Sequence, residues 1–262
     1  MSARRTILPL LVMAFALSQV QATCVYSPPP ILSHGQGADT LGAGRMAVGA
    51  EGGWGALGSW WNASNVGDPE VTTKPVGAAR LRAAVGDNVD VGLVSGIGPQ
   101  RSFILGPELK WRFARFAPDA RPGGPSFNAG LISGIGVGTA EYPYESMSAP
   151  RHVFIAPYTG VLASGGVEVV QMFTGLRVAA SETLGNNVRD LTIYPVLAFG
   201  VQLRPTRAVT FFLEGDLAGG ITTHDINDTA VIVYPSLGLS VAFDRPGATP
   251  RAVEPTPGPV QP

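Results

Sequence analysis

Five segments of the chain begin with proline and reach a turn after roughly ten residues, and this spacing constrains the fold more than any other feature. The segments begin at Pro75, Pro107, Pro157, Pro195 and Pro235. Each leads to a short cluster of turn residues, such as Gly86-Asp87-Asn88 or Arg204-Pro205-Thr206. One tilted β-strand that crosses a lipid bilayer has about 9–11 residues. The array therefore predicts strands of membrane-spanning length.

Apolar and polar residues alternate with a period of two throughout the body of the chain, which is typical of β-strands. The alternation predicts ten strands, with cores at 45–56, 74–85, 89–97, 103–115, 127–139, 152–163, 167–178, 191–203, 208–219 and 230–243. Most links after odd-numbered strands, such as 57–73 and 179–190, are longer than those after even-numbered strands. This pattern predicts a closed antiparallel transmembrane β-barrel with its short turns in the periplasm.

The five prolines are expected to stand at the heads of the even-numbered strands. Proline cannot donate a hydrogen bond to a sheet ladder, so it is confined to strand starts, bulges and edges. A closed barrel has no edges. We therefore expect each proline to mark the outer rim, where a descending strand enters the apolar zone.

The composition agrees with strands that are apolar on one face. Charged residues make up 14 % of the chain and the mean hydropathy is +0.20, whereas a soluble domain is normally about 25 % charged. No apolar run in the body approaches the roughly 18 residues of a membrane helix. The net charge of −1, with no basic block, argues against a nucleic-acid partner.

Residues 1–23 are typical of a secretory signal peptide. Two arginines precede an apolar core at Ile7–Leu17, and Val20–Ala22 fits the small-x-Ala cleavage pattern. Cys24, the one cysteine of the chain, leaves two alternatives open: cleavage after residue 22, or cleavage before Cys24 with lipid attached to it. One cysteine excludes an intramolecular disulfide framework.

Three further regions follow the signal peptide. Residues 24–43 are polar and rich in proline, and they predict a semi-rigid periplasmic leader. Residues 44–243 form the predicted outer-membrane β-barrel. Residues 244–262 contain many prolines and no apolar period, which predicts a disordered tail. A solvated end is favoured for this tail, and a docking segment is the alternative.

The position of charges along the strands predicts which face lines the lumen. Counted from each proline, even offsets are apolar, as at Leu109, Trp111 and Phe113, and odd offsets are charged or small. An arginine facing lipid at mid-depth costs about 2–4 kcal/mol, so the odd offsets must face the lumen. The predicted lumen ionic cluster consists of Glu51, Arg80, Arg82, Asp90, Glu108, Lys110, Arg112, Glu168, Glu214 and Asp216.

This cluster predicts either a self-neutralising ionic plug or a narrow polar pore. Mixed charge favours the plug, because buried charges are tolerated only when they are paired. Gln171 does not fit the assignment, since the predicted register points it at lipid. The strand that contains it therefore has a bulge or an incorrect phase.

The closing part of the body resembles a known class of membrane protein. Phe211–Leu217 followed by Tyr234–Phe243 resembles the last hairpin of the small outer-membrane β-barrels of Gram-negative bacteria, the class with eight to ten strands. The resemblance covers about residues 44–243. It implies an outer-membrane location with outer-membrane lipid as a partner. The signal peptide and the short turns predict that both termini lie in the periplasm, and the leader, the tail or the outer loops are expected to bind envelope proteins.

No catalytic residue, metal site or cofactor is predicted. His224–Asp225 is the one candidate for a catalytic pair at the outer rim, and a solvated loop is favoured because no second carboxylate pair accompanies it. No Cys/His cluster has metal-ligand spacing. The glycines lack the Lys-Ser or Lys-Thr of a phosphate-binding loop.

The leading hypothesis for function is therefore a non-enzymatic anchor or scaffold. Such a barrel could be a subunit of an envelope-spanning assembly for motility, export or adhesion. The alternatives are a narrow porin-like channel for ions or small solutes, a rim enzyme, and a soluble secreted β-sandwich.

Overall fold

The computed structural model describes residues 36–60, 70–98, 102–117, 124–141, 151–185, 188–222 and 229–246, and within them every regular element is a β-strand. The strands are β1 (Arg45–Trp60), β2 (Glu70–Ala84), β3 (Val89–Gly98), β4 (Ser102–Phe116), β5 (Ser126–Glu141), β6 (Arg151–Gly166), β7 (Val170–Gly185), β8 (Val188–Leu203), β9 (Val209–Thr222) and β10 (Thr229–Asp244). The predicted number of strands is confirmed. Among the described residues no helix is long and apolar enough to span a membrane.

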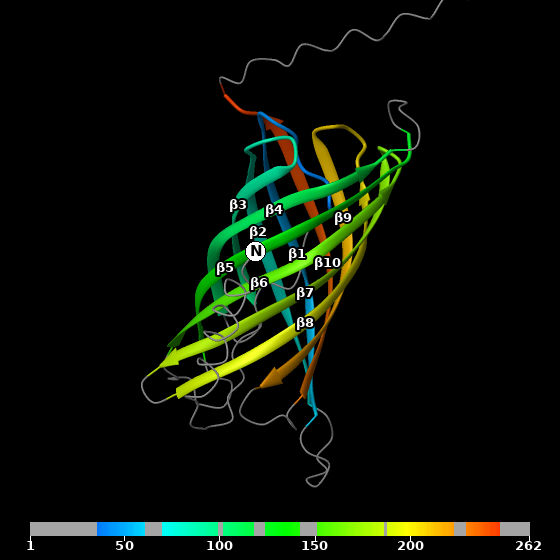
Figure 1. The fold of residues 1–262 in the computed structure, drawn as a ribbon. Helices are drawn as coiled ribbons and strands as arrows, with labels where there is room; N and C mark the ends of the chain where they lie inside the picture. Colours follow the sequence, from blue (N-terminus) through cyan, green and yellow to red (C-terminus); the bar gives the residue numbers. More distant parts are fainter. Residues whose placement is uncertain are drawn as a thin grey trace, which may run out of the picture.

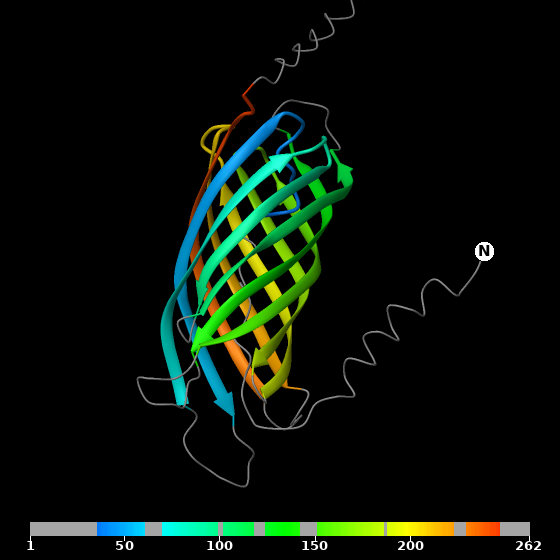
Figure 2. The ribbon, with the colours of Figure 1, turned by 90° about the vertical axis from the view of Figure 1, so that its left-hand side faces the viewer.

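The ten strands close into one antiparallel barrel (Figures 1 and 2). Each strand pairs with its neighbours in sequence, and β1 also pairs with β10 from Arg45↔Asp244 to Trp60↔Thr229. Closure removes the exposed sheet edges that would otherwise pair with other chains. Most strands have 14 to 16 residues. They are therefore longer than a strand that only crosses a bilayer, which needs about 9–11 residues.

The two ends of the barrel differ in the segments and links that lie there. The end at the top of Figure 1 holds residues 36–44, the links β2–β3, β4–β5, β6–β7 and β8–β9, and the last residue of β10. We call it the turn end.

The predicted long link at 179–190 is wrong, because β7 continues to Gly185 and β8 begins at Val188. Small and hydroxyl-bearing residues at 179, 181 and 183 continue the buried face of β7, so the strand extends through them.

The prolines lie inside the strands, and the prediction that they head them is wrong. Each one faces outward, several residues after its strand begins. Pro107 keeps its partner on the preceding strand, Leu93, but the ladder toward β5 is interrupted between Leu105 and Glu108. The same one-sided gap accompanies the prolines of β6, β8 and β10. A local gap in the ladder thus accommodates the missing N–H group.

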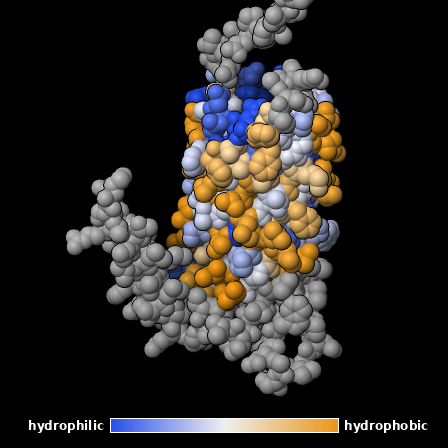
Figure 3. All heavy atoms as spheres, turned by 45° about the vertical axis from the view of Figure 1, so that its right-hand side comes forward, coloured by the Kyte–Doolittle hydropathy of each residue, from blue (hydrophilic) through white to orange (hydrophobic). Residues whose placement is uncertain are grey.

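The barrel wall is apolar outside and polar or tightly packed inside. In β4, residues alternate from buried Ser102 to buried Lys110, with Phe103, Leu105 and Leu109 exposed between them. Figure 3 shows mostly apolar side chains on the face of the wall that it presents and hydrophilic ones at the turn end. The faces counted from the prolines agree with this pattern.

Strand β7 differs from its predicted phase. Val167–Val169 form the link after Gly166, whose φ of 145° turns the chain, and β7 begins only at Val170. Gln171 is therefore buried in the lumen, at 4 % exposure, and Met172 faces outward. The misfit of Gln171 in the sequence came from counting the turn residues as part of the strand.

Candidate functional site in the barrel lumen

A first group of charged side chains lies deep in the lumen and comes entirely from strands. Arg80 of β2 places Nη1 2.6 Å from Oε2 of Glu51 on β1, and both side chains are buried. Arg177 of β7, 1 % exposed, lies over the ring of Tyr158 with Cζ 5.2 Å from the ring centroid. This is a cation–π contact. Asp216 and Glu214 of β9 are buried and attract Arg177 electrostatically.

Large side chains fill the space around this deep group. Ile132, Leu162 and Tyr194 are at most 2 % exposed, and they belong to one buried cluster together with Tyr158 and Tyr234. Gly134 makes room for Tyr158, because a Cβ at this position would lie 2.5 Å from the phenol carbon Cζ. The deep lumen is therefore packed in the manner of a protein core.

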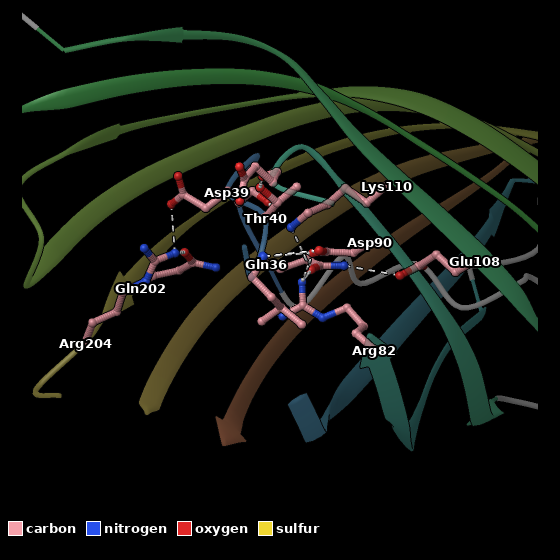
Figure 4. Close-up of polar contacts among 12 residues, drawn as sticks. Gln36, Asp39, Thr40, Arg82, Asp90, Glu108, Lys110, Gln202 and Arg204 are labelled. Atoms are coloured by element: carbon pink, nitrogen blue, oxygen red, sulfur yellow. Dashed lines mark hydrogen bonds and ion pairs between the residues drawn. The ribbon is translucent and has the colours of Figure 1, made fainter. Parts of the chain in front are cut away.

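A second group lies toward the turn end and depends on an inserted segment. Residues 36–41, which we call the inner segment, run inside the mouth of the barrel, where Gln36 and Ala38 are buried (Figures 2 and 4). Lys110 Nζ donates to Gln36 Oε1 at 2.9 Å and to the Gly37 carbonyl at 3.0 Å. Arg82 also donates to the Gln36 side chain.

Further contacts fix the rest of the inner segment. The Leu41 amide donates to both carboxylate oxygens of Asp90 at 3.2 Å. Asp90 is in turn 3.6 Å from Arg82. Asp39 pairs with Arg204 at 2.8 Å (Figure 4). The inner segment is thus held by side chains of β2, β3 and β4 on one side and by the start of the β8–β9 link on the other.

Glu108 connects the two groups. Tyr158 Oη donates to Glu108 Oε2 at 2.7 Å, and Gln36 Nε2 donates to Glu108 Oε1 at 3.2 Å. One carboxylate of β4 therefore touches both the packed deep layer and the inner segment.

A cavity of about 930 Å³ opens beside the inner segment at the turn end. Its charged lining consists of Arg45, Arg82, Arg112, Arg115, Arg204, Arg207, Asp39, Asp87 and Glu168. Six arginines against three carboxylates leave this cavity with a surplus of positive charge.

The structure brings most of the predicted ionic cluster together. Buried or nearly buried in the lumen are Glu51, Arg80, Arg82, Asp90, Glu108, Lys110, Glu214 and Asp216. Arg112 is at the mouth of the barrel, where its Nη2 donates to Asn88 Oδ1 at 2.8 Å and to the Asp87 carbonyl at 3.0 Å.

The placement of Glu168 in the lumen is a prediction that the structure corrects. Glu168 lies in the β6–β7 link at the turn-end cavity, where it pairs with Arg207 at 3.0 Å and its side chain is 43 % exposed. The alternation of Val167 and Val169 around it imitated a strand, but the chain turns there.

Sequence reasoning missed Arg177 and the inner segment. Gln171 and Arg177 share one strand face, so a phase set by these two polar residues would have placed Arg177 in the lumen. Gln36 and Asp39 gave no such signal, because the inner segment has no strand period. Residues 24–43 were expected outside the barrel as a leader, and the described part of them enters its mouth because its polar groups complement buried Lys110, Arg82 and Arg204.

Two candidates from the sequence, Cys24 and the pair His224–Asp225, lie outside the described residues. Within the described residues no group of three or more His, Cys, Asp or Glu side chains is arranged to hold a metal ion.

Comparisons with known proteins give structural likeness only. No protein-family model matches the chain, and no curated protein matches it. The N-terminal β-barrel domain of OprF from Pseudomonas aeruginosa is 12 % identical with a TM-score of 0.37, and the match covers 77 % of this chain and 99 % of that one. An outer-membrane channel from Pseudomonas putida is 11 % identical with a TM-score of 0.40, covering 79 % and 98 %.

The translocator domain of the autotransporter NalP from Neisseria meningitidis is 10 % identical with a TM-score of 0.32, covering 92 % of this chain and 96 % of that one. The class of the present chain follows from its own geometry. It is a closed, ten-stranded antiparallel barrel with an apolar outer wall, which is the architecture of an outer-membrane β-barrel.

Proposed function

We propose that this chain is a sealed, non-enzymatic barrel of the bacterial outer membrane that serves as an anchor or scaffold for other envelope components. The observation that carries the proposal is the packing of the deep lumen. Arg177, Tyr158, Tyr194, Ile132 and Leu162 fill its section and are at most 7 % exposed. A barrel without a continuous pore acts through its wall, its ends and its extensions.

We infer the orientation from the short β2–β3, β6–β7 and β8–β9 links, which have four, three and five residues. Short turns of outer-membrane barrels lie on the periplasmic side, so the turn end faces the periplasm. Residues 36–44 and the end of β10 are both at this end, which directs the leader and the Pro-rich tail toward periplasmic partners. An assembly for motility, export or adhesion would use such extensions as attachment points.

Planar-bilayer recording tests the sealed state. The purified full-length barrel should give no steady single-channel steps, whereas the variant Tyr158→Ala/Arg177→Ala should admit ions through the vacated deep layer. Steady conductance of the wild-type protein would refute the sealed state.

Removal of residues 247–262 tests the scaffold role, because it leaves the β1–β10 pairing intact. After cross-linking in cells, envelope proteins that co-purify with the full chain should be lost from the shortened one. A tail of the same composition in scrambled order is the control. Unchanged co-purification would show that the tail is not an attachment point for these proteins.

A channel that opens and closes is the second candidate, and the inner segment favours it. Residues 36–41 obstruct the turn-end mouth without pairing to any strand. If they were the main barrier, their deletion from the full chain would produce steady conductance.

A further inference from the structure

A β-bulge in β4 brings two arginines to the same side of the barrel wall. Arg112 and Arg115 are separated by an odd number of positions, so in a regular strand one of them would face lipid. The register with β5 shifts between Arg112 and Ala114, so that Arg112 lies opposite Gly130 and Arg115 opposite Asn128. Both arginines line the turn-end cavity as a result. Bulges are a common means of redirecting a side chain at a functional site.

The two arginines lack carboxylate partners among the described residues. The other arginines of the cavity are matched: Arg82 by Asp90, Arg204 by Asp39 and Arg207 by Glu168, and Arg45 lies near Asp244. Arg112 donates only to neutral oxygens, those of Asn88 and of the Asp87 carbonyl. The side chain of Arg115 takes part in no hydrogen bond or ion pair within the described part of the chain.

Buried amides complete the lining beside these arginines. Asn128 is 1 % exposed and Gln171 is 4 % exposed, and both line the cavity. Their side-chain oxygens have no hydrogen-bond partner within the described structure. An unpaired amide oxygen accepts hydrogen bonds, so these two oxygens favour a hydroxyl or other donor group of a bound solute, while an oxyanion of that solute is left to the arginines. Asn128 pairs with Arg115 in the β4–β5 register, so the two residues lie side by side on adjacent strands.

We propose that the turn-end cavity is a binding site for a small solute that bears phosphate or carboxylate groups, with Arg112 and Arg115 as its charged recognition pair. A guanidinium presents two parallel donors that match the two oxygens of either group. Arg112 and Arg115 repel each other, and Asp39, Asp87 and Asp90 attract Arg112 without forming an ion pair with it among the described residues. An oxyanion between the two arginines would lower their repulsion. The volume of about 930 Å³ lies within the range of small-molecule sites.

This site is independent of whether the barrel conducts, because it lies at the turn end and the packed layer lies beyond it. Its orientation toward the periplasm rests on the proposed function. A failure to bind would therefore refute the binding site and leave the proposal of a sealed barrel intact. Conductance would refute the sealed barrel and leave the binding site intact.

Calorimetric titration of the full-length barrel in detergent tests the proposal, with inorganic phosphate, pyrophosphate and citrate as separate probes. At least one probe should bind saturably, and the preferred probe identifies phosphate or carboxylate as the recognised group. Arg115→Gln and Arg112→Gln should each weaken binding about tenfold or more, since each removes a charge-assisted pair of hydrogen bonds. Arg115→Lys keeps the positive charge and loses the two parallel donors of the guanidinium. Its affinity should lie between those of the wild type and Arg115→Gln.

Arg245→Gln is the matched control, because Arg245 is an exposed arginine at the same end and does not line the cavity. Its affinity should equal that of the wild type. The proposal is overturned if no probe binds saturably to the wild-type barrel, or if Arg245→Gln weakens binding as much as Arg115→Gln. Gel mobility before and after boiling confirms that each variant is folded.

Discussion

The deep lumen and the turn-end lumen of this barrel are both charged, yet they are built in different ways. In the deep lumen the contacts described above join residues of paired strands, so the register of the sheet fixes contacts such as Glu51–Arg80. At the turn end, Lys110, Arg82 and Arg204 meet the inner segment, which belongs to no strand. Closure of the deep lumen is thus a property of the fold, and closure of the mouth depends on a separate segment.

Solvent exposure of the ion pairs follows the same division. The side chains of Arg80 and Glu51 are 9 % and 1 % exposed, those of Arg204 and Asp39 are 24 % and 14 %, and those of Arg207 and Glu168 are 81 % and 43 %. Buried pairs are costly to break from one side only, and exposed pairs contribute little. The cost of losing one partner should therefore fall steadily toward the turn end.

The largest effect is expected from Glu51→Leu. The change removes the nearest carboxylate of buried Arg80, which should lower the free energy of unfolding by about 3–5 kcal/mol. Urea unfolding of the refolded barrel, followed by tryptophan fluorescence, measures it. Glu51→Leu/Arg80→Leu should recover most of the loss, because an apolar pair leaves no unmatched charge.

Glu168→Gln is the control for Glu51→Leu, because it removes one partner of the most exposed of the three ion pairs. It should change the free energy of unfolding by no more than about 1 kcal/mol. Equal losses for Glu51→Leu and Glu168→Gln would show that the deep pair has no special weight.

A smaller loss is expected from Gly134→Ala in the deep layer. The added Cβ would lie 2.5 Å from Cζ of Tyr158 and 2.8 Å from the Pro107 carbonyl oxygen. Overpacking of this kind typically costs about 1–3 kcal/mol. Gly219→Ala is the matched control, since its Cβ would meet only Pro195 Cγ at 3.8 Å. Unfolding curves that move equally for both variants would contradict close packing around Tyr158.

The smallest global effect is expected from Arg204→Gln, which removes the partner of Asp39. Loss of this partly exposed pair should lower the free energy of unfolding by about 1 kcal/mol or less. Its main effect should be local: amide hydrogen exchange should accelerate over residues 36–44 and remain unchanged in β7. Faster exchange across the whole barrel would mean that the inner segment and the sheet open together.

The sequence predicted the barrel well because its signals are local. Period-two alternation located all ten strands, and the cost of an arginine in lipid assigned the lumen face for Arg80, Lys110 and Glu108. Both signals depend only on the residue and its neighbours in the strand.

The rest depended on contacts that sequence spacing does not contain. The inner segment is held by partners that are distant in sequence, such as Lys110 with Gln36. It has no periodic pattern of apolar and polar residues from which its position could be predicted. The prolines were misplaced because a one-sided gap in the ladder accommodates them in mid-strand. Arg115 faces the cavity only because of the β4 bulge, which no alternation predicts.

The most direct test of the account is the conductance of the full chain lacking residues 36–41. The deep layer of Arg177, Tyr158 and Tyr194 should keep this variant as electrically silent in planar bilayers as the wild-type barrel, although its turn-end cavity is larger. Steady single-channel steps from the folded variant, absent from the wild type, would contradict the account and make the inner segment the gate of a channel.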